Sequence, residues 1–161
     1  MISFLKEKIS ECLSSGSVKW MSFRFLEHTA DVKIEVISRT REEAFEVAGQ
    51  AMVEVITAIS KVDAKKKKSI AVTGEDLYAL LYEWLEALIV LFGAEGLIFS
   101  RFKVHKIEQK KNEWHLAGEV WGETFDINKH PQGTEIKAIT YSEMEIQEEE
   151  SKVRLQFVFD I

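Results

Sequence analysis

The apolar residues of this chain recur with a helical period in two segments and with a strand period in most of the others. The first helical segment follows Thr40 and Glu43, which together form the capping-box signature of a helix start. The apolar positions on its predicted face are Ala44, Phe45, Ala48, Ala51, Met52, Val55, Ile56 and Ile59. Because this spacing matches the 3.6-residue turn of an α-helix, the segment is predicted to be an amphipathic helix.

A second helix is predicted to open at residues 74–76 and to end at Gly93, a residue type that commonly terminates helices. Its apolar positions are Leu77, Leu80, Leu81, Trp84, Leu85, Leu88, Ile89 and Phe92. We interpret this stripe as core, because burying large apolar side chains is the most direct way to stabilise a domain. The longest uninterrupted apolar run, residues 87–92, is shorter than the about 20 residues that a membrane span takes, so we predict no membrane segment.

Alternating apolar and polar residues predict strands on both sides of these helices. The alternating segments are 23–25, 32–36, 70–72, 102–104, 114–120 and 153–159. Four lysines, residues 65–68, are predicted to form a solvated loop, and residues 110–113 a polar hairpin turn. Two helices packed against a mostly antiparallel sheet define an α+β, two-layer domain.

The charge, cysteine content and hydrophobic content of the chain exclude several classes of protein. The 161 residues include 27 acidic and 21 basic side chains, giving a formal charge of −6, which argues against a nonspecific nucleic-acid binder. One cysteine, Cys12, excludes an internal disulfide framework and a cysteine-cluster metal site. Hydrophobic residues make up 46% of the chain, enough to form a core.

Residues 1–20 are predicted to be an N-terminal extension rather than part of the domain, which we place at residues 21–161. Charged residues interrupt the apolar positions of the extension, so it does not resemble a signal peptide. Ile2, Leu5, Ile9 and Leu13 recur at helical spacing and predict a short amphipathic helix there. Met21 is an alternative start of the protein. We expect an intracellular, cytoplasmic protein that does not bind a membrane.

Polar residues gather at three places: residues 27–31, residues 122–133 and residues 159–161. Asp160 and the α-carboxylate of Ile161 follow a strand that alternates to its end, so the sheet should hold both groups. Two anionic groups held close together repel each other unless a cation or a donor lies between them. Hard oxygen ligands suit calcium, magnesium or manganese better than zinc. The alternative is a last strand with one exposed aspartate.

The residues alone do not form a complete catalytic apparatus. His28 and His130 lie in the first two polar segments and are better functional candidates than His105 and His115, which fall on polar strand faces. Neither candidate belongs to a recognisable metal-ligand spacing. The sequence also has no phosphate-binding glycine-rich loop and no nucleophile elbow. No catalytic site can therefore be assigned from the residues alone.

Four short motifs, in this order, resemble the archease family. They are Phe25-Leu26-Glu27-His28-Thr29-Ala30-Asp31-Val32, Glu95-Gly96-Leu97-Ile98-Phe99-Ser100, Lys137-Ala138-Ile139-Thr140-Tyr141 and the ending Val158-Phe159-Asp160-Ile161. The resemblance covers residues 21–161, and several motifs in the right order are more specific than any one of them.

The resemblance implies an accessory protein of tRNA splicing and RNA repair that is not itself an enzyme. Archeases assist the GTP-dependent ligase that joins RNA ends bearing a 2′,3′-cyclic or 3′-phosphate to a 5′-hydroxyl. They promote guanylylation and multiple turnover of that ligase. The resemblance therefore implies that this protein contacts the ligase directly and RNA only indirectly. The implied metal ligands are Asp31, Asp160 and Ile161. The implied metal is a divalent cation, with calcium as the first candidate and magnesium or manganese as alternatives.

Four further residues are candidates to support these ligands or to contact the partner: His28, Asp126, His130 and Lys137. For each, the alternative is a hydrogen bond that shapes a loop. Two positions depart from the family pattern: Ser142 stands where His is common, and Lys33 where Gly is frequent. Two other functions remain open, a chaperone-like protein-binding module with a structural metal and a stand-alone metal-dependent hydrolase of phosphate esters.

Overall fold

The computed structural model describes residues 21–26 and 30–161, so the predicted extension at residues 1–20 lies outside the described residues. The elements are β1 Ser22–Leu26, β2 Val32–Ser38, α1 Arg41–Ile56, the 3₁₀ turn Ile59–Lys61, β3 Lys66–Gly74, α2 Leu77–Glu95, β4 Leu97–Lys110, β5 Glu113–Thr124, β6 Ala138–Glu149 and β7 Lys152–Asp160. The α+β class predicted from the sequence is confirmed.

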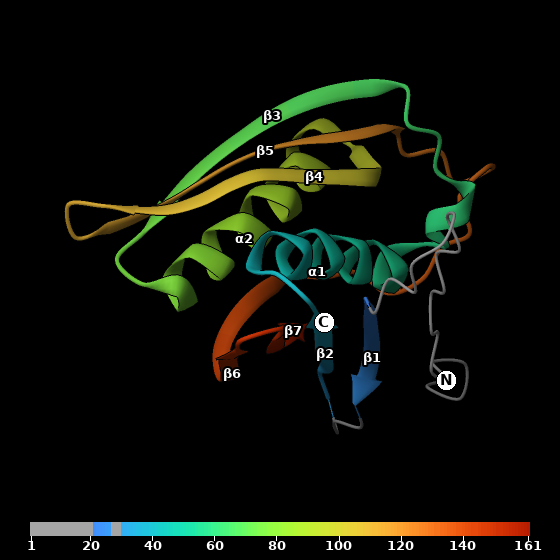
Figure 1. The fold of residues 1–161 in the computed structure, drawn as a ribbon. Helices are drawn as coiled ribbons and strands as arrows, with labels where there is room; N and C mark the ends of the chain where they lie inside the picture. The colour runs from blue at the N-terminus through green and yellow to red at the C-terminus, as the bar shows by residue number, and fades with distance from the viewer. Residues whose placement is uncertain (1–20, 27–29) are drawn as a thin grey trace, which may run out of the picture.

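The strands form two antiparallel sheets where the sequence predicted one. The first sheet has the order β1-β2-β7-β6, and the second has the order β3-β5-β4. Both helices contact strands of both sheets and lie between them (Figure 1). The segment 125–137 leaves β5 in one sheet and enters β6 in the other, so this connection joins the two halves of the molecule.

The predicted helical stripes meet between the sheets. Trp84 of α2 is fully buried, and its indole N–H donates a hydrogen bond of 2.9 Å to the carbonyl oxygen of Phe45 in α1. Both predicted helix starts are confirmed: Thr40 accepts a bond from the Glu43 N–H at 3.2 Å, and Asp76 accepts one from the Ala79 N–H at 2.7 Å. These caps satisfy amides that have no partner inside the helix.

Among the described residues, α2 is the one helix that is long and apolar enough, by length and composition, to cross a membrane. Glu83 and Glu86 interrupt its apolar positions, so uninterrupted apolar runs in the sequence do not reveal it. The face of α2 that carries Trp84 is built into the core of the domain, which is the usual position of such a helix in a folded protein. Only five of its 19 residues are buried, however.

Two local predictions were wrong, and one strand was not predicted. The second helix does not end at Gly93 but continues to Glu95, and Gly96 ends it with φ of 63°, a left-handed conformation that glycine adopts without strain. Three of the four lysines of the predicted loop, residues 66–68, belong to the edge strand β3, where charged side chains are well tolerated. Strand β6 was not predicted, because exposed polar residues occupy most of its length.

Candidate functional site

Asp31 and Asp160 lie at the same end of one strand pair. Asp31 directly precedes β2, and Asp160 is the last residue of β7. In the antiparallel register of these strands, Val32 pairs with Phe159. Extending that register by one residue places Asp31 opposite Asp160, although the two lie 129 positions apart in the sequence. We call this end of the first sheet the β2–β7 edge.

Lys137 joins the β2–β7 edge from the other side of β7. Ala138, the first residue of β6, pairs with Asp160. The Lys137 backbone N–H donates to the Asp160 carbonyl oxygen at 2.9 Å, and its ammonium donates to the Ile161 carbonyl oxygen at 3.1 Å. A predicted supporting residue and two predicted ligands are therefore in direct contact.

The oxygen chemistry of the edge fits a hard divalent cation. Two carboxylates and the oxygens of Ile161 are the donors that calcium, magnesium and manganese prefer. Within residues 21–26 and 30–161, no three His, Cys, Asp or Glu side chains cluster closely enough to hold a metal. A cation at the β2–β7 edge would therefore need backbone oxygens in addition to Asp31 and Asp160.

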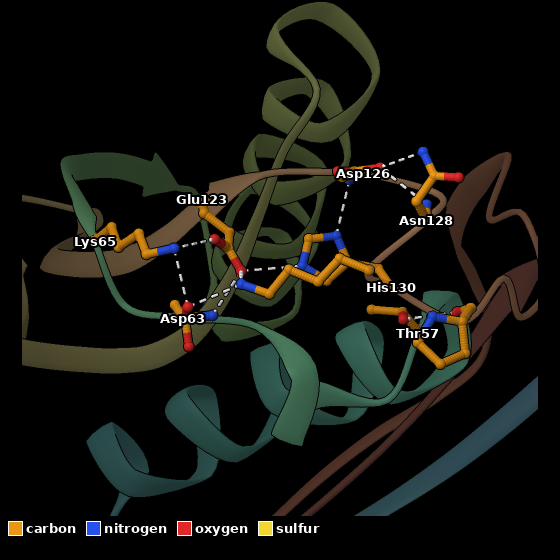
Figure 2. A network of polar contacts seen from close by, with 9 residues as sticks. Thr57, Asp63, Lys65, Glu123, Asp126, Asn128 and His130 are labelled. Atoms are coloured by element: carbon orange, nitrogen blue, oxygen red, sulfur yellow. Dashed lines mark hydrogen bonds and ion pairs between the residues drawn. The ribbon is translucent and has the colours of Figure 1, made fainter.

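A second polar cluster surrounds Glu123, at the end of β5 in the other sheet (Figure 2). The Glu123 side chain is 10% exposed and accepts hydrogen bonds from the Asp63 N–H at 2.8 Å and the Lys65 ammonium at 3.1 Å. It also contacts the Lys129 ammonium at 2.5 Å and His130 Nε2 at 3.0 Å. We call these residues the Glu123 network.

The contacts of His130 determine which of its two ring nitrogens carries the proton. Its Nδ1 accepts a hydrogen bond of 2.8 Å from the Asp126 N–H, so the ring proton lies on Nε2, which donates to Glu123. The hydrogen bond from the Asp63 N–H, followed by those from Lys129, His130 and Lys65, holds the pKa of Glu123 far below its usual value despite burial. The network therefore keeps the Glu123 carboxylate ionised, with the Nε2–H of His130 as one of its donors.

One loop connects the Glu123 network to the β2–β7 edge. After Asp126 and His130, the chain crosses the end of α1, where the Thr57 hydroxyl donates to the Pro131 carbonyl oxygen at 2.7 Å. The Gly133 N–H then donates to the Ile56 carbonyl oxygen at 2.8 Å. A few residues later the same loop reaches the β2–β7 edge, where Lys137 contacts the end of β7.

The structure separates the predicted supporting residues. His28 lies outside the described residues. Lys137 belongs to the β2–β7 edge, whereas Asp126 and His130 belong to the Glu123 network. The Asp126 carboxylate accepts from the Asn128 N–H at 2.9 Å, and His130 is 0% exposed, so both shape the loop.

Sequence reasoning did not single out Glu123. Its donors Asp63 and Lys65 lie about 60 residues earlier, and no spacing in the sequence connects them with β5. The one available signal was its place in the polar segment 122–133 directly after a predicted strand.

The fold and the β2–β7 edge define a class of protein: an α+β domain with two antiparallel sheets and paired carboxylates at one sheet end. Residues 23–161 match the sequence profile of the archease protein family. The chain belongs to the archease family.

Relatives of the chain are named archease. The protein archease of Sulfurisphaera tokodaii is 45% identical over 139 residues, which cover 86% of this chain and 98% of the relative. That of Pyrococcus furiosus is 48% identical over 121 residues, covering 75% and 84%.

Solved structures agree with the fold. The solution structure of Methanobacterium thermoautotrophicum protein 1598 is similar with a TM-score of 0.76 and 37% identity, covering 86% of this chain and 98% of that one. A Thermotoga maritima crystal structure, described as an archease and possible chaperone, has a TM-score of 0.54 at 22% identity, covering 84% and 94%, and bears on the fold alone.

Proposed function

We propose that this protein binds a divalent metal at the β2–β7 edge and activates the GTP-dependent RNA ligase that joins 3′-phosphate and 5′-hydroxyl RNA ends. The observation that carries the proposal is the convergence of Asp31, Asp160 and Lys137 at one sheet end. Membership of the archease family supports it. The net charge of −6 is consistent with a protein that acts on the ligase rather than on the RNA.

The residues of the edge have distinct roles in this proposal. Asp31 and Asp160 supply carboxylates, and Ile161 supplies backbone oxygen. Lys137 orients the end of β7 through its bonds to the Asp160 and Ile161 carbonyl oxygens. A divalent cation held there would stabilise negative charge that develops on a nucleoside triphosphate during nucleotidyl transfer.

The test uses Asp31→Asn and Asp160→Asn, which keep side-chain shape and remove one charge each. Glu150→Gln is the matched control, because Glu150 is an exposed carboxylate in the turn at the opposite end of β7. Calorimetric titration with calcium should show that both aspartate variants lose binding while the control retains it. With catalytic amounts of the cognate ligase, both variants should lose stimulation of repeated RNA ligation.

Three outcomes would contradict the proposal. Undiminished stimulation by both aspartate variants would show that the edge does not carry the activity. Partner binding without metal dependence or stimulation would indicate a chaperone-like binding module. Turnover of a small phosphate ester in the absence of ligase would indicate a hydrolase.

A further inference from the structure

Two tyrosines from different elements form an exposed stack. Tyr141 of β6 lies parallel to Tyr82 of α2, with ring centroids 4.6 Å apart and an angle of 10° between the rings. Tyr141 is nevertheless 56% exposed. Because one face of its ring lies on Tyr82, the exposed area lies on the other face and the ring edge. Tyr78, one helical turn before Tyr82, is 40% exposed, and we call these three residues the tyrosine patch.

The tyrosine patch belongs to an apolar helix face that is incompletely covered. Strands β3 and β6 flank α2, but most of its residues are not buried by the described part of the chain. Further along α2, Ile89 is half-buried and Val90 is 53% exposed. Exposed apolar side chains that gather on one element are more typical of interaction sites than scattered single ones.

Carboxylates surround the patch. Glu75, Asp76 and Glu83 are exposed at the first turns of α2. Glu83 directly follows Tyr82, the residue on which Tyr141 stacks. Burial, followed by electrostatic interactions with Glu83, Tyr82, Asp76 and Glu75, raises the pKa of Tyr141. The exposed tyrosine ring is therefore accompanied by carboxylates.

This combination favours one kind of occupant. An aromatic face binds a flat guanidinium by stacking and cation–π attraction, and carboxylates nearby accept its N–H groups. The phosphates of RNA and of anionic lipids would be repelled by the same carboxylates. A second copy of the chain, presenting the same face, would bring like charges together.

The patch also lies close to the β2–β7 edge. Tyr141 is three residues along β6 from Ala138, the partner of Asp160, which at the rise of a strand is about 10 Å. A protein that contacts the edge would therefore reach the patch.

We propose that the tyrosine patch is a docking surface for an arginine on the surface of a partner protein, with Tyr141 stacking on the guanidinium and Glu75 and Glu83 accepting its N–H groups. The identity of the partner, the RNA ligase, rests on the proposed function.

The test measures affinity of the full-length protein for the ligase, with metal present, by biolayer interferometry at low and high salt. Tyr141→Ala and Glu83→Lys should each weaken binding by about tenfold, and Tyr141→Phe, which retains the stack, by less than about twofold. Glu113→Lys, at the first residue of β5, is the charge control and should bind as wild type. Circular dichroism of each variant excludes loss of fold.

The outcomes separate the two proposals. Stimulation by Tyr141→Ala should recover at high protein concentration, because docking sets affinity, whereas Asp31→Asn should not recover. If wild type stimulates ligation while Tyr141→Ala and Glu83→Lys bind as well as wild type, the docking inference is wrong and the proposed function stands. If wild type neither binds nor stimulates the ligase, both are wrong. A Tyr141→Ala effect confined to anionic vesicles or to self-association would also overturn the docking inference.

Discussion

Removing the carboxylate of Glu123 should destabilise the domain more than removing any exposed carboxylate of the same strand. In Glu123→Ala, the ammonium groups of Lys65 and Lys129 keep the Asp63 carboxylate as a partner and are 62% and 38% exposed, so their loss is small. The N–H of Asp63 and the Nε2–H of the fully buried His130 lose their acceptor instead. Two donors left unsatisfied in this way cost about 3 kcal/mol together.

Urea unfolding at neutral pH measures this cost from the shift in midpoint at constant slope. Glu123→Gln, which retains one acceptor oxygen, should lose about 1–2 kcal/mol. Glu119→Ala is the control, because Glu119 lies on the same strand and contacts Lys67 and His105 at the surface. The unfolding midpoint of this variant should stay close to that of wild type. A loss below about 1 kcal/mol for Glu123→Ala, or one equal to that of the control, would refute the reasoning.

The pH dependence gives an independent check. The pKa of Glu123 in the folded protein lies below its ordinary value of 4.5, so its ionised form favours folding. The ionised Glu123 therefore makes its full contribution to the free energy of unfolding above pH 4.5, and this contribution is lost as the pH falls toward the pKa of the folded state. Stability of the wild type should fall more steeply than that of Glu123→Gln below pH 4.5. Parallel curves would contradict the assigned contacts.

Further predictions concern single positions and are checked by the same unfolding assay. Gly122→Ala should destabilise the domain by about 3 kcal/mol or more, because the added Cβ would lie 1.8 Å from the Ile98 carbonyl oxygen. Gly93→Ala, whose Cβ would meet nothing within 4 Å, should instead stabilise α2 by about 0.5–1 kcal/mol. Thr40→Ala removes the acceptor of the Glu43 N–H and should cost about 1 kcal/mol, whereas Thr40→Ser should cost little.

The helices were predictable from the sequence because their apolar period and their caps are local signals. Thr40 and Asp76 satisfy amides only three residues away, so the chain itself records both helix starts. The division into two sheets is not a local property. Strand β6 is mostly exposed and carries little apolar alternation, and it is held mainly by its pairing with β7.

The same distinction separates the two polar clusters. The family resemblance names Asp31, Asp160 and Lys137, and the strand register then places them together. The Glu123 network carries no such signal, since its acceptor and its donors come from β5, from the segment before β3 and from the loop after β5. That loop also carries Lys137, which contacts the end of β7. If the β2–β7 edge binds calcium as proposed, Glu123→Ala should weaken calcium binding in a calorimetric titration without changing any of the proposed ligands, whereas unchanged affinity would show that the loop does not couple the two clusters.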